Sequence, residues 1–560
     1  MSKKINILLF LIVSLLIVLT VVIQSSLQHW SAQWDLDFWY IYNASLMSSG
    51  IQQEWYDHPA TTILSLYSFF YKIYSLFDYS FIYKINEIKD ASNPNFVLQK
   101  LYFVTRIFDS INIILIVFFT FKISKILSSK DLYAYFLTLT MIVSGQFLNN
   151  LSILNPEDWA SLFCLMSFYY FLKFFNKNNV IFLILSGLFF LFGFLTKINV
   201  LFIFFFIILL IPIFNELYSK KSDNLLQNVL EKNFIFLFGG YLLLLLIYFI
   251  IQTFILDKLD VFAKTAGLDA FILIAINLIY MSFFLIISKF NLEKFRTYFS
   301  IFILFLSGFI FGLIVFLLID ILNIAKLNPL IIVHLVKPFY KMINFASVPG
   351  MDPPMLGVAL LENSFSIIDQ LLLVTKQIFS NFYFDNFLFT GLCLIFLISI
   401  FHDFTNKNIY SFLFKLIIFF NLVFNTLILN FRFFIEYLVY NHIIYVVLLS
   451  VCFKNISSKI IKPFCIISIF YILIFLPIKN SSLYLADGGI PGIRFTTWKS
   501  IVSTRPSQLN TLCSNYDTNK AESLFFFDIY AKEFDGETFS KICNIPKSRF
   551  SVSGDRYFLE

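Results

Sequence analysis

The chain has 560 residues, of which 59% are apolar and only 13% are charged, and its mean hydropathy is +0.82. A water-soluble core does not need so much apolar material, whereas a membrane needs a run of about 20 apolar residues for each helix that crosses it. The net charge of +7 is the kind of excess that reports topology in a membrane protein. With no basic tail or nucleic-acid motif, we expect no nucleic-acid partner.

Apolar runs mark about thirteen candidate helices and predict an all-α polytopic membrane protein. They centre on residues 7–23, 101–121, 132–148, 159–175, 180–195, 199–214, 234–255, 270–288, 299–322, 385–401, 409–428, 433–452 and 460–477. The first run follows Ser2-Lys3-Lys4 and precedes no small-residue cleavage site, so we expect an uncleaved anchor. The pattern predicts a transmembrane domain over residues 1–477 and a small extracytoplasmic domain over residues 478–560.

Lysine and arginine residues set the expected orientation, because cytoplasmic loops of membrane proteins carry an excess of them. With the N-terminus in the cytoplasm, the inner segments carry seventeen of these residues and the short outer loops carry four. Three longer segments then lie outside, namely 26–100, 325–381 and 478–560. The first of them is rich in Trp, Tyr and His, which is typical of short helices at a membrane interface.

The inner segments are too short for a folded domain, since the longest spans only about residues 215–233. The sequence has no Walker loop and no GxGxxG after a strand. An ATP-driven pump, or an enzyme that uses cytosolic nucleotide sugars, would therefore need a partner chain.

The six cysteines fall into two groups. Four lie in or beside apolar runs, where we expect free packing residues: Cys164, Cys393, Cys452 and Cys465. Cys513 and Cys543 lie in the polar C-terminal segment. An oxidising compartment outside the membrane would allow these two to form a disulfide.

Ionisable residues within or beside apolar runs are costly to bury and are therefore candidates for function. In the expected topology most of them lie in one layer near the outer surface: Asp35, Asp37, Asp57, His58, Arg106, Asp109, Glu157, Asp158, Lys197, Asp320, Arg432 and Glu436. His442 and Lys415 are exceptions, and we expect Lys415 to extend toward the inner surface. Each residue alone is compatible with an ordinary helix-end charge, but the clustering favours a site that opens outward.

The strongest local pattern follows the first apolar run. It reads Trp34-Asp35-Leu36-Asp37-Phe38-Trp39-Tyr40-Ile41-Tyr42-Asn43-Ala44, then Gly50, then Trp55-Tyr56-Asp57-His58-Pro59-Ala60. This segment resembles the first outer loop of the GT-C superfamily, the polyprenyl- or dolichyl-phosphate-sugar transferases that include protein mannosyltransferases and aminoarabinose transferases. Three other segments resemble motifs of that superfamily: Asn155-Pro156-Glu157, Gly193-Phe194-Leu195-Thr196-Lys197 and Arg432-Phe433-Phe434. The motif resemblance covers about the first 215 residues, and topology alone extends it further.

The resemblance implies a glycosyltransferase of the bacterial inner membrane that acts on the extracytoplasmic face with inversion. Its donor would be a polyprenyl-phosphate-linked sugar, and its acceptor a lipid, a glycan or a protein. Asp35 or Asp37 would be the general base for the acceptor hydroxyl. The superfamily often has adjacent acidic residues, whereas Leu36 separates the two here, so either aspartate can hold the role and the other can cap the next helix.

The departing lipid phosphate needs cations to stabilise its charge. The candidates for donor-phosphate binding are Lys197, Arg432, Arg106 and His58, with Glu157 and Asp57 in supporting positions. Glu157 can orient Lys197 or Arg432, or can simply favour a helix N-terminus. No cofactor is required. A divalent cation between Asp35 and Asp37 is compatible with this chemistry but not demanded, because a monophosphate leaves without the charge of a diphosphate.

Two other classes remain open. A transporter or flippase of lipid-linked glycans would need a polar path across the bilayer and pseudo-symmetric halves. An O-antigen ligase or polymerase would carry its main charges in a late, large outer loop rather than after the first helix.

Overall fold

The computed structural model describes residues 3–27, 37–53, 60–142, 154, 156–197, 200–218, 225–250, 268–329, 386–429, 438–456, 458–471, 550–553 and 556–559. Within these ranges the chain forms seventeen helices and one short β-hairpin. The helices are α1 (Lys3–Leu27), α2 (Asp37–Ser48), α3 (Thr61–Phe77), α4 (Ile85–Asp90), α5 (Pro94–Ser128), α6 (Asp131–Ile142), α8 (Pro156–Lys177), α9 (Val180–Thr196), α10 (Val200–Tyr218), α11 (Leu225–Lys232), α12 (Phe234–Ile250), α13 (Leu268–Ile287), α14 (Leu292–Ile321), α19 (Asn386–Thr405), α20 (Ile409–Leu429), α21 (Leu438–Asn455) and α22 (Ser458–Phe470). Each predicted apolar run contains a helix, which confirms the helical fold class for the described residues.

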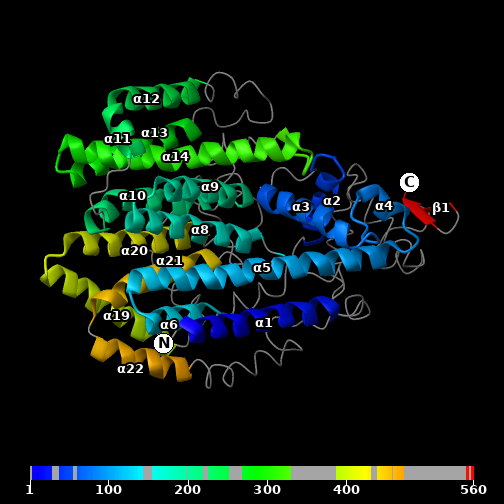
Figure 1. Cartoon of the computed structure of the whole chain (residues 1–560), viewed down its shortest axis with the longest axis horizontal. Coiled ribbons are helices and arrows are strands. Elements are labelled where there is room, and N and C mark those ends of the chain that lie inside the picture. The colour runs from blue at the N-terminus through cyan, green and yellow to red at the C-terminus, as the bar shows by residue number, and fades with distance from the viewer. Residues whose placement is uncertain are drawn as a thin grey trace, which may run out of the picture.

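The long helices run side by side, and α2, α3 and α4 gather at one end of the bundle (Figure 1). We call this end the α2–α4 end and the opposite one the turn end. At the turn end, short turns join α5 to α6, α8 to α9, α13 to α14 and α19 to α20. Each turn contains a non-glycine residue in the left-handed region: Ser129, Asn178, Lys289 with Phe290, and Lys407. A left-handed residue ends a helix abruptly, so these turns reverse the chain within a few residues.

Asparagine side chains begin several of the helices. Asn179 accepts a hydrogen bond from the Ile181 backbone N–H, and Asn291 accepts one from Lys294. Asn93 does the same for Phe96, with Pro94 in the first turn of α5. These caps satisfy backbone donors that a helix leaves unpaired. The cap at Asn93 also explains why α5 begins at Pro94, well before the predicted apolar run 101–121.

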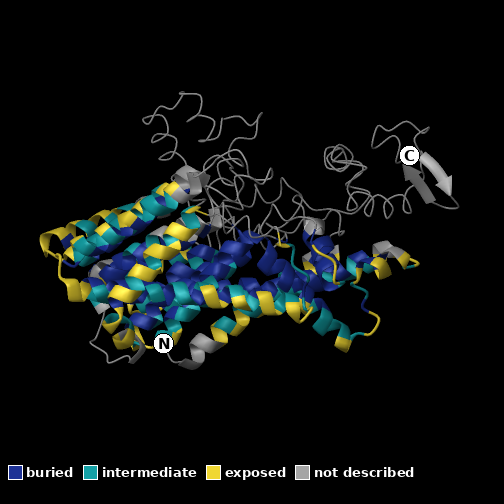
Figure 2. Cartoon of the chain, turned by 90° about the horizontal axis from the view of Figure 1, so that it is seen from above, coloured by how far each residue is buried: buried dark blue, intermediate teal, exposed yellow. Residues whose placement is uncertain are grey.

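Two helical stretches are long and apolar enough to cross a membrane, Phe96–Ser128 and Leu292–Ile321, and many of the other helices carry shorter apolar stretches. Outward faces of the bundle carry large apolar side chains, such as Leu15 on α1 and Phe236 on α12. Figure 2 shows that buried residues concentrate inside the bundle and around α2 and α3. A water-soluble helix would place polar residues on its outward face, whereas these outward positions of α1 and α12 are apolar.

Helices α9 and α14 approach each other through glycine. A Cβ atom at Gly187 would overlap the backbone carbonyl of Phe305, and one at Gly308 would overlap that of Ile184. Gly312, one turn after Gly308, faces the Leu191 side chain. Small residues spaced in this way let two backbones pack closely without a bulky side chain between them.

Gly187→Ala and Gly308→Ala should each destabilise the protein. The added methyl group meets backbone rather than a movable side chain, and overpacking of this kind costs about 1–3 kcal/mol. Thermal unfolding of the purified protein in detergent measures the effect. Gly239→Ala and Gly240→Ala are matched controls in α12, because a Cβ there meets nothing within 4 Å, and they should not lower the midpoint. An unchanged midpoint for both Gly187→Ala and Gly308→Ala would contradict the close α9–α14 packing.

Two expected loop regions contain helices. The outer segment 26–100 was predicted to hold short interfacial helices, and it contains α2, α3 and α4. The inner segment near residues 215–233, predicted too small to fold alone, contains the short helix α11. Residues 330–385, most of the predicted second outer loop, lie outside the described residues.

The C-terminal region is described only at its last few residues. Strands β1 (Phe550–Ser553) and β2 (Arg556–Leu559) pair in antiparallel fashion with Phe550 opposite Leu559. The predicted disulfide partners Cys513 and Cys543 lie outside the described residues. Cys164, Cys393, Cys452 and Cys465 are free cysteines, as predicted, and all but Cys393 are buried.

Candidate functional site

Hydrogen bonds attach the short helices of the α2–α4 end to the long ones. The Thr62 hydroxyl of α3 and the Thr196 hydroxyl of α9 both donate to the carbonyl of Phe192, at 2.9 and 2.7 Å. Ser68 of α3 donates to the carbonyl of Ala44 in α2 at 2.8 Å. The first turn of α3 therefore lies against the last turn of α9, and α2 lies against α3 (Figure 1).

The buried carboxylate of Asp109 joins three helices. Its Oδ2 atom lies 3.3 Å from Arg106 Nη1 of the same helix, α5, and both side chains are fully buried. Its Oδ1 atom accepts hydrogen bonds from Trp159 Nε1 of α8 at 2.7 Å and from the Tyr67 hydroxyl of α3 at 3.4 Å. A buried carboxylate needs such donors and a nearby cation, so its partners fix where α3, α5 and α8 can lie.

Tyrosines of α3 face this network as neutral donors. Burial, and then the neighbouring Asp109 carboxylate, raise the pKa of the Tyr67 phenol well above its ordinary value. Burial likewise raises the pKa of Tyr71, whose hydroxyl lies 2.7 Å from Thr105 Oγ1 of α5. Both phenols therefore keep their protons over the physiological pH range, and they tie α3 to α5 through hydrogen bonds alone.

A second ion pair lies at the same end of the bundle. Lys197, which follows α9, contacts the Glu157 carboxylate in the first turn of α8, and their side chains are 11% and 2% exposed. Asp158 beside it is also buried. Glu157 therefore pairs with Lys197, one of the two cations that the sequence analysis considered for it, and both belong to helix ends that meet near α3.

The structure describes only some of the predicted site residues. Arg106, Glu157 and Lys197 belong to the two ion pairs. Asp37 is the first residue of α2, but its side chain is not described. The other predicted site residues lie outside the described residues: Asp35, Asp57, His58 and Arg432. The assignment of Arg106 to donor-phosphate binding stays a prediction, and in this structure its guanidinium is engaged by Asp109.

The sequence analysis did not predict two members of the Asp109 network, Tyr67 and Trp159. Trp159 follows the predicted pair Glu157-Asp158 directly, and this acidic helix start was the one local signal near it. Tyr67 offers no such signal, because its contact with Asp109 joins residues 42 positions apart. Only the packing of α3 against α5 brings these two side chains together.

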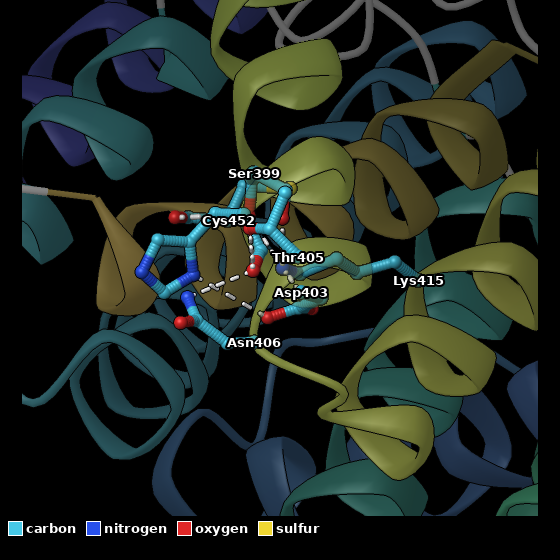
Figure 3. A network of polar contacts seen from close by, with 7 residues as sticks. Ser399, Asp403, Thr405, Asn406, Lys415 and Cys452 are labelled. Carbon is cyan, nitrogen blue, oxygen red and sulfur yellow. Dashed lines mark hydrogen bonds and ion pairs between the residues drawn. The ribbon is translucent and has the colours of Figure 1, made fainter.

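Another buried ion pair lies at the turn end, between α19, α20 and α21 (Figure 3). Lys415 Nζ contacts Asp403 Oδ2 at 2.5 Å, Ser399 Oγ at 2.5 Å and the Ser399 carbonyl at 3.1 Å. Lys415 and Asp403 are both fully buried. Asp403, across the α19–α20 turn, neutralises Lys415 inside the bundle, and the expectation that Lys415 extends toward the inner surface stays a prediction.

Metal binding is not indicated in the described part of the chain, where no cluster of three or more His, Cys, Asp or Glu residues could hold an ion. The predicted alternative of a divalent cation at Asp35 and Asp37 concerns side chains outside that part, and it stays a prediction. No protein-family model, curated protein or solved structure matches this chain. The functional argument therefore depends on the residues and their geometry.

Asp109→Ala should destabilise the protein strongly, because it removes the carboxylate that neutralises a buried guanidinium. Breaking a buried pair in this way costs about 3–5 kcal/mol. Arg106→Met/Asp109→Ala removes both charges and should be less destabilised than the sum of the single changes. Thermal unfolding of Asp109→Ala, Arg106→Met and the double variant in detergent gives the comparison. Additive single changes would show that Arg106 and Asp109 do not interact.

Trp159→Phe keeps an aromatic ring but loses the N–H that donates to Asp109. It should lower the free energy of unfolding by about 1–2 kcal/mol, measured in the same way.

Proposed function

We propose that this protein is a membrane glycosyltransferase of the GT-C type, which transfers a sugar from a polyprenyl-phosphate donor to a lipid, glycan or protein acceptor. The observation that carries this proposal is the convergence of two buried ion pairs, Arg106–Asp109 and Lys197–Glu157, at the α2–α4 end. The same end is built from the segment whose sequence resembles the first outer loop of that superfamily. Cations and carboxylates that meet at the end of the bundle holding α2, which belongs to that segment, suit transfer from a lipid phosphate.

The apolar surfaces of the bundle support a membrane location. Exposed faces of α1, α12, α13 and α14 are lined by Leu, Ile and Phe, which suits contact with lipid. We place the turn end in the cytoplasm and the α2–α4 end outside, as the Lys and Arg bias predicts. Helices α2 to α4 then lie at the outer interface, where a lipid-linked donor and its acceptor would both be within reach.

The proposed reaction is a single displacement at the anomeric carbon of the donor sugar. Asp35 or Asp37 accepts the proton of the acceptor hydroxyl as its oxygen bonds to the anomeric carbon. The bond between that carbon and the phosphate oxygen breaks, and its electrons leave with the polyprenyl phosphate. Lys197, with Arg432 and His58, stabilises the charge on the departing phosphate, while Glu157 holds Lys197 in position.

A transporter is less well supported by the buried charges. Such a protein needs polar groups that continue between the two faces of the membrane. The Lys415 cluster lies at the turn end, and the three N–H donors of its ammonium group already meet three acceptors, Ser399 Oγ, the Ser399 carbonyl and Asp403 Oδ2. A saturated network of this kind is better suited to holding α19, α20 and α21 together than to passing a substrate.

Asp35→Ala/Asp37→Ala should abolish sugar transfer in membranes supplied with polyprenyl-phosphate sugars. Loss of a general base slows a reaction about 10²–10⁴-fold, so each single change shows which aspartate is the base. Release of polyprenyl phosphate and formation of the glycosylated acceptor are both measured. Asp78→Ala, in the turn after α3 where Asp78 pairs with Lys100, is the control, because it removes a carboxylate outside the proposed site, and it should retain activity. Full transfer by the double variant would refute the proposed site.

Cysteine labelling in intact cells tests the orientation. In a background without the six native cysteines, Tyr79→Cys should react with a membrane-impermeant maleimide, because Tyr79 is 94% exposed at the α2–α4 end. Lys407→Cys, in the turn between α19 and α20, should react only after the cells are permeabilised. Labelling of Lys407→Cys from outside would reverse the proposed topology.

A further inference from the structure

The N-terminus of α3 is buried, and no cap is present among the described residues. Ala60, Thr61, Thr62 and Ile63 are each at most 4% exposed, and the N-cap position, Ala60, provides no side-chain hydrogen bond. The first backbone N–H to bond within the helix belongs to Leu64, which donates to the Ala60 carbonyl at 2.9 Å. The N–H groups before it have no acceptor within the helix. Buried donors of this kind are normally satisfied by a side chain, by water or by a ligand.

The Thr61 hydroxyl supplies a second unsatisfied group in the same turn. Its Oγ1 atom is buried and has no hydrogen-bond partner within the part of the chain that the structure describes. The neighbouring hydroxyls differ, because Thr62 donates to the Phe192 carbonyl and Ser65 donates to the Thr61 carbonyl. An unpaired buried hydroxyl is costly. The Thr61 hydroxyl lies in the same turn as the backbone N–H groups that have no acceptor within the helix. One bound acceptor could therefore satisfy the hydroxyl and these N–H groups together.

The electrostatics of this corner favour an anion. A helix N-terminus carries a partial positive charge. Thr62 and Thr196 share the Phe192 carbonyl, so Lys197, the next residue after Thr196, is the cation that belongs to this helix end. Glu157 contacts Lys197 and holds it at this helix end.

We propose that the first turn of α3 binds the phosphate group of the lipid-linked donor. The backbone N–H groups of Thr61, Thr62 and Ile63 and the Thr61 hydroxyl donate to the phosphate oxygens, and Lys197 supplies the compensating charge. Phosphate suits this turn because its several oxygens accept bonds from successive N–H groups at once, as at other helix N-termini. The assignment rests on the proposed function, and it adds the element and the donors that hold the phosphate.

Ala60→Asp tests the empty cap directly. A carboxylate at the N-cap position can accept hydrogen bonds from the next backbone N–H groups and would occupy the position of the phosphate. In the full-length protein without ligand, we expect a higher midpoint of thermal unfolding than in the wild type. Ala60→Val is the control, because it adds similar bulk without an acceptor. A lower midpoint for Ala60→Asp than for Ala60→Val would show that no positive site exists there.

Thr61→Val tests the hydroxyl while nearly preserving its shape. With the protein in nanodiscs and polyprenyl monophosphate as the probe, we expect binding to weaken about tenfold, the loss typical of one hydrogen bond to a charged group. Thr138→Val is the matched control, because that buried hydroxyl bonds within its own helix, and it should bind as the wild type does. Ala60→Asp should bind no polyprenyl phosphate.

Two further probes identify the source of the phosphate. Polyprenol, which lacks the phosphate, should bind equally to the wild type, Thr61→Val and Ala60→Asp. Inorganic phosphate should compete only weakly, and tight binding of it alone would overturn the assignment to a lipid. Binding is measured without turnover, so the phosphate site and the proposed sugar transfer can be refuted independently of each other. Wild-type binding of polyprenyl phosphate by Thr61→Val and Ala60→Asp would refute the phosphate site, whereas transfer by Asp35→Ala/Asp37→Ala bears only on the proposed reaction.

Discussion

Neutralising a charge inside an apolar bundle is the constraint on which the α2–α4 end depends. A buried guanidinium such as that of Arg106 costs several kcal/mol unless a carboxylate and further hydrogen bonds surround it. Asp109, three residues along the same helix, supplies the carboxylate. That carboxylate must in turn be satisfied, and Trp159 and Tyr67 do so from α8 and α3. The position of α3 therefore follows from the charge on α5.

The two ends of the bundle handle buried charge differently. At the turn end, Lys415 contacts an acceptor with each of its three N–H groups, and left-handed residues end the helices there. At the α2–α4 end Lys197 stays 11% exposed, and the Thr61 hydroxyl in the adjoining turn of α3 has no partner among the described residues. Charge alone therefore does not distinguish a functional end from a structural one.

The helices were predictable because the apolar runs are long. The charged residues of the site were predictable too, since Arg106 and Asp109 share a helix face by their spacing. Contacts between helices were not. Asp403 and Lys415 are 12 residues apart, and only the geometry of a tight turn between two helices brings them together. Likewise, nothing local marks Gly187 and Gly308 as the points where α9 and α14 touch.

Backbone contacts then extend the constraint from the Asp109 network to the end of α9. Glycine at positions 187 and 308 holds α9 against α14, so the far end of α9 cannot shift without separating those two backbones. The Phe192 carbonyl near that end receives the Thr62 hydroxyl, which fixes the first turn of α3 from one side. Tyr67 lies less than two turns further along α3, and its hydrogen bond to Asp109 fixes the same helix from a second side. Two independent anchors thus hold an uncapped, buried helix N-terminus beside Lys197, and a position defined so rigidly is suited to receiving an anion in one orientation.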